Sequence, residues 1–430
     1  MNAKDGTRRE FLKGTAAVAG AVAAAGIILP KAYAAGTDLI RIGLIGCGGR
    51  GTGAAHQALS VPNSNVKLVA MADAFENRLS GALNELTKKH ADKLDVPAER
   101  KFVGLDAYQK LFEHCDLVIL ATPPGFRPSH FEAAVAAGKH VFMEKPVCVD
   151  SFGARMVLAA AKVADEKKLK VVCGLQRHYQ NVYRETLKAL KDGIIGDIVS
   201  GQVYWNGNGI WYRERQGDMS EMKFQVHNWY HFNWLCGDHI CEQHVHNIDV
   251  ANWFLGANPI SACGMGGRVD KVKNSEIFDH HYVEFQYPNG VIINSQCRQI
   301  AGTKSDVSEK FLGTKGILHI GRAVDYKGKE LWRYEGKGDL DPYQVEHNEH
   351  QAAIRSDTAI NNAYYTANST FAAVLGRSAT YTGQEIKWDD LLKMDYRTFP
   401  KELNWDAATP TKPGTDGRYA VPIPGQFKLV

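Results

Sequence analysis

Two short segments of the chain carry side chains suited to moving a proton and stabilising a developing negative charge. Lys145 lies in the sequence Met-Glu-Lys-Pro at 143–146, and Glu242, His246 and Asp249 lie in a second segment further along the chain. Histidine suits general acid–base work near neutral pH, and a lysine ammonium can stabilise an alkoxide. On one helix, Glu242, His246 and Asp249 would share a face, so the glutamate could orient the histidine ring. A solvated helix face and an ion-paired surface lysine are the structural alternatives.

A glycine-rich loop follows the first apolar run of the chain and reads Gly-Cys-Gly-Gly-Arg-Gly at 46–51. In the pattern GxGxxG, the first glycine allows a tight turn, the second lets the backbone approach a pyrophosphate, and the third permits close helix–strand packing. A helix amino terminus after the loop would supply N–H groups for the phosphates. The candidate cofactor contacts in this loop are Gly46, Gly48, Gly49, Arg50 and Gly51.

Asp73 ends the next apolar run, 22 residues beyond Gly51. A carboxylate at this place accepts hydrogen bonds from an adenosine ribose and repels a 2′-phosphate, which favours NAD over NADP. Arg78 lies nearby and leaves NADP open. Ligands of open α/β sheets lie beyond the carboxyl ends of the strands. We therefore expect further cofactor contacts at or just after the carboxyl ends of the next strands. The candidates are Thr122, Pro123, His130, Glu144 and Lys145.

Two regions with different patterns must position these residues. From 38 to 175, short apolar runs alternate with helical patterns, which predicts a doubly wound parallel sheet, that is, an N-terminal Rossmann domain. From 176 to 400, clustered strand candidates predict an α/β domain with an open, largely antiparallel sheet, which would bind the substrate. In this domain Pro-Asn-Gly at 288–290 predicts a hairpin turn, and a single helix is expected near 240–254. A Pro- and Gly-rich tail, 401–430, ends the sequence.

Nine aromatic residues lie between 204 and 234. Aromatic rings with a polar atom suit stacking on sugars, although core packing explains most such rings. Trp205, Tyr212, Arg177 and Asp249 are the candidate substrate contacts. A metal site is not expected, because the His-x-His pair at 244 and 246 diverges on a helix and no other ligand cluster supports one.

The first 34 residues have the order of an export signal, with an Arg-Arg pair at 8–9, an apolar run and an Ala-Tyr-Ala sequence before the expected cleavage after Ala34. The arginine pair followed by Phe-Leu-Lys is typical of a twin-arginine signal, so we expect the twin-arginine export machinery as a partner and the periplasm as the location. The signal holds +3 of the net charge of +4, so the remaining chain is almost neutral. This balance disfavours a nucleic-acid partner.

Taken together, GCGGRG, Asp73, ATPP, EKP and EQHVHNID resemble the glucose–fructose oxidoreductase/inositol dehydrogenase (Gfo/Idh/MocA) family over 38–400. The resemblance implies that Lys145 contacts substrate and nicotinamide, and that His246 is the acid–base residue on a helix of the second domain. The family pattern is D-x-x-x-H-x-x-D, so Asp249 takes the last acidic place and Glu242 replaces the usual aspartate. The longer side chain of Glu242 can still reach the place of that aspartate.

Three functions remain open. The first is an NAD(P)-dependent oxidoreductase that transfers hydride between a secondary alcohol of a sugar or cyclitol and a tightly bound nicotinamide cofactor. The second is a redox-neutral, NAD-dependent glycosidase that oxidises, eliminates and reduces its substrate. The third is a non-catalytic sugar-sensing protein, which intact Lys145 and His246 disfavour. We expect a small carbohydrate or cyclitol as substrate and a homo-oligomer as the working form.

Overall fold

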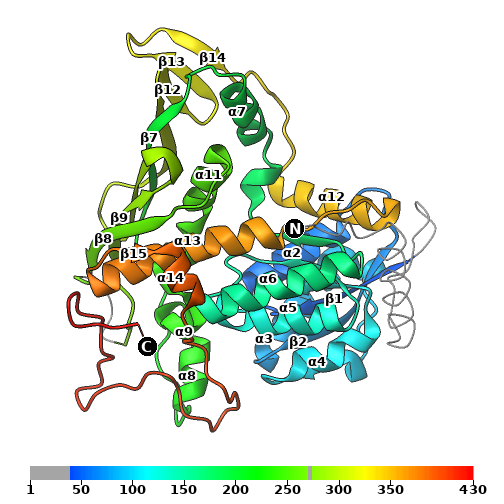
Figure 1. Cartoon of the computed structure of the whole chain (residues 1–430). Helices are drawn as coiled ribbons and strands as arrows, with labels where there is room; N and C mark the ends of the chain where they lie inside the picture. Colours follow the sequence, from blue (N-terminus) through cyan, green and yellow to red (C-terminus); the bar gives the residue numbers. More distant parts are fainter. Residues whose placement is uncertain (1–38, 270–273, 430) are drawn as a thin grey trace, which may run out of the picture.

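The computed structural model describes residues 39–269 and 274–429. The signal predicted at 1–34 lies outside the described residues. Two sheets with their helices form the molecule, and the Rossmann half and the second half lie side by side in Figure 1. Across the described part of the chain, every helix is too short or too polar to span a bilayer.

The first sheet confirms the predicted Rossmann fold. It is six-stranded and parallel, with the order β3-β2-β1-β4-β5-β6. Its strands are β1 (Ile40–Ile45), β2 (Val66–Asp73), β3 (Lys101–Val103), β4 (Leu117–Leu120), β5 (His140–Met143) and β6 (Val171–Cys173). The central strands are buried throughout, because helices cover both faces of the sheet. Edge strand β3 was not predicted, since it has three residues, two of them exposed.

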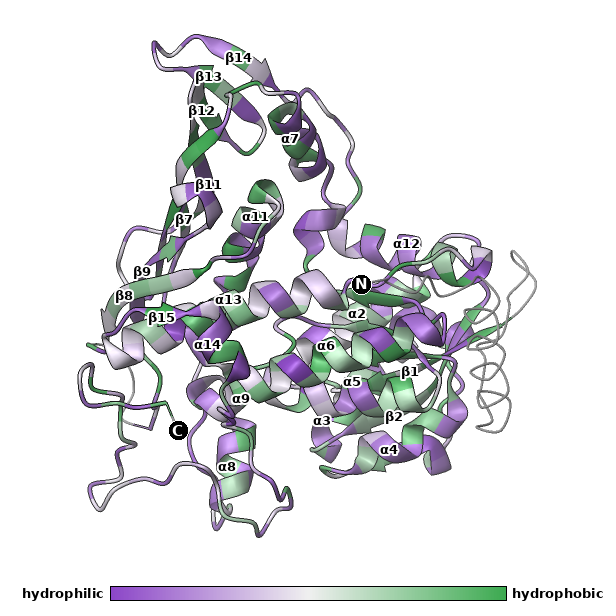
Figure 2. Ribbon diagram, viewed as in Figure 1, coloured by the Kyte–Doolittle hydropathy of each residue, from purple (hydrophilic) through white to green (hydrophobic). Residues whose placement is uncertain are grey.

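Five helices connect these strands, and they match the helical patterns of the sequence. They are α2 (Gly49–Leu59), α3 (Glu76–His90), α4 (Ala107–Leu111), α5 (Arg127–Ala136) and α6 (Ser151–Glu166). Asp150 begins α6 as its N-cap, accepting a hydrogen bond from the Gly153 N–H at 2.7 Å. Hydrophilic and hydrophobic residues alternate along α5 and α6 in Figure 2, as expected for helices with one buried face.

The second sheet is nine-stranded and largely antiparallel, as predicted. Its order is β14-β13-β12-β11-β7-β10-β9-β8-β15, and β7 and β10 form its parallel pair. The strands are β7 (Ile198–Gly207), β8 (Ser261–Gly267), β9 (His280–Gln286), β10 (Ile292–Gln299), β11 (Asp306–Gly313), β12 (Gly316–His319), β13 (Arg322–Asp325), β14 (Glu330–Arg333) and β15 (Ile386–Lys387). The predicted turn joins β9 to β10, with φ of 64° at Asn289 and 78° at Gly290.

The remaining helices are α7 (Asn181–Lys191), α8 (Glu221–His227), α9 (Asn233–Cys236), α10 (Asp238–Glu242), α11 (Val245–Leu255), α12 (Pro342–Ser356), α13 (Ala363–Thr382) and α14 (Trp388–Lys393). Helix α12 returns from the second sheet to pack on α2 of the Rossmann domain. Helix α13 begins in the Rossmann core at Ala363 and ends against β8 and β9. These two crossings fix the halves relative to each other, so part of 176–400 belongs to the Rossmann core.

The single helix expected near 240–254 is wrong, because the structure has two helices there. Helix α10 ends at Glu242 and α11 begins at Val245, with Gln243 and His244 between them. The spacing of four residues between Glu242 and His246 therefore does not place them on one continuous helix face. The expectation that Glu242 orients the His246 ring loses its geometric basis.

Candidate active site

The glycine-rich loop has the geometry that its sequence predicts. Gly46 has a φ of +92°, and a Cβ on Gly51 would lie 1.9 Å from the Gly46 carbonyl oxygen, so both positions require glycine. By contrast, a Cβ on Gly48 or Gly49 would meet nothing within 4 Å, so the loop backbone is open to the cavity. Helix α2 begins at Gly49 and turns its amino terminus towards this space.

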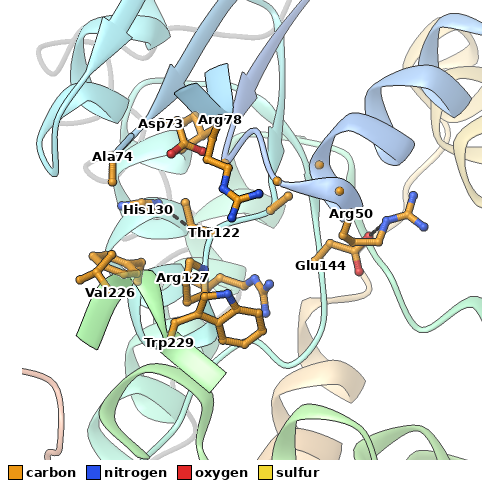
Figure 3. A pocket seen from close by; sticks show the side chains of 18 of the residues that line it. Arg50, Asp73, Ala74, Arg78, Thr122, Arg127, His130, Glu144, Val226 and Trp229 are labelled. Atoms are coloured by element: carbon orange, nitrogen blue, oxygen red, sulfur yellow. Dashed lines mark hydrogen bonds and ion pairs between the residues drawn. The ribbon is translucent and has the colours of Figure 1, made fainter. Parts of the chain in front are cut away.

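Asp73 lies at the carboxyl end of β2, beside the loop. Its carboxylate accepts hydrogen bonds from the backbone N–H of Cys47 at 2.6 Å and of Phe75 at 2.8 Å. Burial raises the pKa of Asp73, while these N–H groups and the charge of Arg78 oppose the rise. Asp73 and Arg78 lie on the same side of the pocket in Figure 3.

Arg50 and Glu144 lie at the other end of the loop as an ion pair, with Arg50 Nε 3.1 Å from Glu144 Oε1. The Glu144 side chain is buried, and the Arg50 guanidinium also lies over the Tyr343 ring at 4.8 Å. Tyr343 belongs to α12, so the crossing helix contributes to the wall of the site. Figure 3 shows the pair beside the loop.

Thr122 and His130 are paired near the centre of the same pocket. Thr122 Oγ1 lies 3.2 Å from His130 Nδ1, and the His130 ring stacks on Tyr108 with a centroid distance of 4.0 Å. Burial lowers the pKa of His130 to about 3, so its ring is neutral at physiological pH. Thr122, Pro123 and His130 all line the cavity.

Lys145 follows β5 and contacts the second domain directly. Its Nζ donates a hydrogen bond to the backbone carbonyl oxygen of Glu242 at 2.6 Å and lies 3.5 Å from Glu242 Oε1. Both side chains are largely buried, and burial raises the pKa of Glu242 against the opposing charge of Lys145. The partner of Glu242 is therefore Lys145 and not His246.

His246 lies in the first turn of α11 and lines the cavity together with Lys145. Its ring is nearly parallel to that of Trp205 on β7, with a centroid distance of 5.6 Å and an interplanar angle of 20°. Burial, reinforced by the charge of Lys145, lowers the pKa of His246 well below its ordinary value. Its Nδ1 is buried and has no hydrogen-bond partner among the described residues.

Three predicted substrate contacts lie outside the lining of the cavity. Arg177 makes a buried ion pair with Glu309 of β11. Asp249 lies 2.8 Å from His178 Nε2 and accepts a hydrogen bond from Ser369 Oγ at 2.8 Å. Tyr212 accepts a hydrogen bond from Asn274 Nδ2 at 2.7 Å. Of the four candidates, Trp205 lines the cavity. The other three side chains are held by these partners, and their roles as substrate contacts stay predictions.

The cavity has a volume of about 480 Å³ and runs between the two domains. It also contains residues that the sequence analysis did not select: Arg127, Gln176, Trp211, Arg213, Val226, His227, Trp229, Gln243 and Tyr343. Arg127 is the most buried cation of this set, at 4 % exposure, and it donates a hydrogen bond to the Pro146 carbonyl oxygen. Its position in the first turn of α5, just beyond the end of β4, was the signal that could have identified it.

Two protein-family models match the chain, one in each domain. The model of the oxidoreductase family, NAD-binding Rossmann fold, matches residues 40–174, and that of the GFO/IDH/MocA C-terminal domain matches residues 183–319. The chain belongs to the Gfo/Idh/MocA oxidoreductase family. The predicted resemblance to this family is confirmed on both domains.

Individual members of the Gfo/Idh/MocA family resemble the chain more distantly. It is 25% identical to the inositol 2-dehydrogenase of Rhizobium meliloti over 228 residues, which cover 52% of this chain and 57% of that protein. It is 28% identical to a glycosyl hydrolase family 109 protein of Streptomyces coelicolor over 165 residues, 38% of this chain and 33% of that protein. The chain thus spans little more than half of the first relative and a third of the second.

Among solved structures, the chain is similar to scyllo-inositol dehydrogenase from Lactobacillus casei with bound NAD(H) and scyllo-inositol. The TM-score is 0.61, and the match covers 82% of this chain and 100% of that one at 20% identity. A levoglucosan dehydrogenase in complex with NADH and levoglucosan gives a TM-score of 0.62 at 15% identity, with coverage of 81% and 99%. At these identities the likeness supports the fold alone.

Proposed function

We propose that this protein transfers hydride between a secondary alcohol of a sugar or cyclitol and a nicotinamide cofactor. The observation that carries the proposal is that Lys145 and His246, from different domains, line one cavity with the glycine-rich loop and Asp73. A base, a cation and a dinucleotide loop in one cavity are the groups that alcohol oxidation requires.

The residues present fit a dinucleotide. The space in front of Gly48 and Gly49 is open, the amino terminus of α2 faces it, and Asp73 lies where an adenosine ribose would be held. The carboxylate of Asp73 favours NAD, and Arg78 in the same cavity keeps NADP as the alternative. When bound, the nicotinamide supplies the hydride acceptor for oxidation or the hydride donor for reduction.

His246 is the residue suited to take the hydroxyl proton. Because its pKa lies well below the ordinary value, the ring is neutral at physiological pH and can accept a proton. The Trp205 ring beside it fixes the orientation of the imidazole. As the alcohol carbon gives up a hydride, its oxygen loses a proton to His246 and the carbonyl forms.

Lys145 is suited to stabilise the alcohol oxygen as negative charge develops on it. The Glu242 carbonyl oxygen, which accepts a hydrogen bond from Lys145 Nζ at 2.6 Å, holds the ammonium at the junction of the two domains. An ammonium has three N–H donors, so the Glu242 contact leaves donors for a substrate hydroxyl. Glu242 is therefore a positioning residue for Lys145.

The polar and aromatic lining favours a small polyhydroxylated substrate. Trp205 beside His246 offers an aromatic ring, and Gln176 and Gln243 offer amide groups that can bond hydroxyls. Inositol dehydrogenases among the relatives support a cyclitol or sugar as the substrate class.

A redox-neutral glycosidase is the second candidate, and the family 109 glycosyl hydrolase among the relatives favours it. In this reaction the same His246 would take the proton of a sugar hydroxyl near the glycosidic bond and Lys145 would stabilise its oxygen, with the hydride passing to the nicotinamide when it is bound. Elimination would release the aglycone, water would add to the resulting double bond, and return of the hydride would restore the alcohol. The net result is hydrolysis.

We further propose that the protein is exported folded by the twin-arginine route and works in the periplasm. The support is the Arg-Arg pair at 8–9 with the apolar run that follows it. The periplasmic proposal requires that the cofactor stays bound, because it is acquired before export.

Absorbance at about 340 nm of the purified protein, with and without candidate sugars, tests the reaction. Change of this band with a free sugar supports the dehydrogenase, and release of an aglycone without net change supports the glycosidase. Lys145→Ala and His246→Ala should each abolish turnover, whereas His319→Ala, on the exposed end of β12, should not. Full turnover in both active-site variants would exclude the mechanism proposed here.

A further inference from the structure

The outer wall of the cavity, beyond Asp73, is contributed by the second domain. Arg213, Val226, His227 and Trp229 line the cavity together with Ala74, Phe75 and Arg78 of the Rossmann domain. Figure 3 shows Val226 and Trp229 facing the side that holds Asp73 and Arg78. The Phe75 and His227 rings touch edge to face, with a centroid distance of 5.6 Å. The two domains thus meet over the place where the adenosine half of a dinucleotide is expected.

Arg213 is held rigidly in this wall. Its guanidinium lies over the Trp211 ring at 3.9 Å, and its Nη1 donates a hydrogen bond to the His227 carbonyl oxygen at 2.7 Å. Its backbone N–H and carbonyl both bond the Asn228 amide, each at 2.9 Å. Burial lowers the pKa of His227, and the charges of Arg213 and Arg78 lower it further. Arg78, Arg213 and His227 all line the same cavity. Such a cluster is suited to the phosphates of an adenosine diphosphate.

The wall is supported from outside by a segment beyond the family domains, residues 399–419, which we call the C-terminal strap. On the Rossmann side, the Phe399 and Phe126 rings pack at 5.3 Å, and those of Trp405 and Phe75 at 5.6 Å. The strap has no regular helix or strand, and it passes around α8 in Figure 1. One apolar cluster joins strap, α8 and the Rossmann loops.

Polar contacts bind the strap to α8. Ser220, the N-cap of α8, donates a hydrogen bond to the Trp405 carbonyl oxygen at 3.1 Å, and Gln225 Nε2 donates one to the Thr411 carbonyl oxygen at 2.8 Å. The Tyr419 hydroxyl, on a buried side chain, donates a hydrogen bond to Glu221. Movement of α8 away from the cavity must therefore break contacts along its whole length.

We propose that Arg213, His227 and Trp229 form the second-domain half of an adenosine diphosphate site, and that the C-terminal strap locks this half over the bound dinucleotide. This inference rests on the proposed function, since it assumes a dinucleotide in the cavity. It explains how an exported enzyme keeps its cofactor: release requires α8 to move, and the strap opposes that movement.

The test measures release of NADH from the full-length enzyme after dilution into excess NAD⁺, followed by the fluorescence of the bound nucleotide. Trp405→Ala should accelerate release at least tenfold. Tyr419→Phe, which removes only the hydroxyl bonded to Glu221, should accelerate it severalfold without risk to the fold. Phe427→Ala is the matched control, because Phe427 lies in the tail against Tyr381 and away from the cavity. Wild-type release rates in both strap variants, or equal acceleration in the control, would overturn the proposal.

A second measurement addresses the wall itself. ADP-ribose has the adenosine and both phosphates but lacks the nicotinamide, so its affinity reports on this end of the site alone. Arg213→Gln should weaken ADP-ribose binding about tenfold, and unchanged affinity would remove Arg213 from the site. If ADP-ribose binds and the variants behave as expected while no sugar is turned over, the proposed function fails and this inference stands. If the wild type binds neither NADH nor ADP-ribose, both fail.

Discussion

Lys145 of the Rossmann domain contacts Glu242 of the second domain through both backbone and side chain, at 2.6 Å from the carbonyl oxygen and 3.5 Å from Oε1. Glu242→Gln keeps the backbone contact and removes the charge. We expect kcat to fall about tenfold with a smaller change in KM, since a charge-assisted contact contributes roughly 1.5–3 kcal/mol. Steady-state kinetics with the sugar substrate measure both constants.

The pH profile separates this positioning role from a purely structural one. Burial raises the pKa of Glu242, so in the wild type kcat should fall as the pH drops through this raised pKa and Lys145 loses its charged partner. Glu242→Gln should lack this limb and keep only the limb at lower pH that protonation of His246 causes. Glu284→Gln, a substitution of an exposed glutamate, is the control and should keep the acidic limb of the wild type. An unchanged limb in Glu242→Gln would contradict the role.

Trp205 stacks on His246 and helps to bury it. Trp205→Leu should admit water to the imidazole, so the pKa of His246 should rise towards 6.5, its ordinary value. The acidic limb of kcat/KM should then move to higher pH, and kcat should fall because the ring is less well oriented. Tyr204→Phe, at the neighbouring position on the other face of β7, should leave the profile in place.

Local structure alone places several of the residues that line the cavity. Gly46, Gly51, Asp73 and Lys145 lie at the ends of buried strands or directly after them, and a parallel sheet brings such ends to one edge. These residues could therefore be predicted from apolar runs and spacing alone.

The sequence does not reveal contacts between residues that are distant in the chain. Arg177 is paired with Glu309, 132 residues away, and no local pattern reveals that pair. Glu242 was expected to orient the His246 ring because both residues were placed on one continuous helix. In the structure α10 ends at Glu242 and a new helix, α11, begins at Val245. Arg213 lines the cavity and its neighbour Tyr212 does not, which depends on the packing of an irregular segment.

His130 should make the stability of the protein sensitive to acid. Its pKa is lowered to about 3 in the folded state, whereas the unfolded chain takes up the proton near 6.5. As the pH falls below 6.5, His130 is therefore protonated in the unfolded state but stays neutral in the folded state. The free energy of unfolding decreases as a result. The contribution of this one group is about 1.4 kcal/mol per pH unit, or roughly 3 kcal/mol at pH 4.

Other buried groups also titrate in this range, so the comparison must be made between variants. His130→Asn retains a polar partner for Thr122 but does not titrate. The difference in unfolding free energy between wild type and His130→Asn, from urea denaturation at pH 7 and pH 4.5, should shift in favour of the variant at the lower pH. A pH-independent difference would show that His130 takes up a proton as readily in the folded state as in the unfolded state.

Alanine substitutions at three glycines of the Rossmann domain should distinguish effects on stability from effects on cofactor binding. Gly51→Ala places a Cβ 1.9 Å from the Gly46 carbonyl oxygen, so loop and helix must separate, which should cost about 1–3 kcal/mol of stability and also weaken dinucleotide binding. Gly48→Ala meets no atom within 4 Å and should leave the Tm unchanged. It should still weaken NADH binding, because its methyl group occupies the space through which the backbone would approach the phosphates.

Gly81→Ala is the matched control for both variants. Gly81 lies within α3, and its added Cβ would also meet nothing within 4 Å. Alanine is the better helix former by about 0.5–1 kcal/mol, so the Tm should rise slightly while NADH affinity stays constant. Thermal denaturation and NADH fluorescence titration on the three variants provide the readouts. Normal NADH affinity in Gly48→Ala would mean that the loop backbone does not approach the phosphates, and the dinucleotide would then have to be placed elsewhere in the cavity.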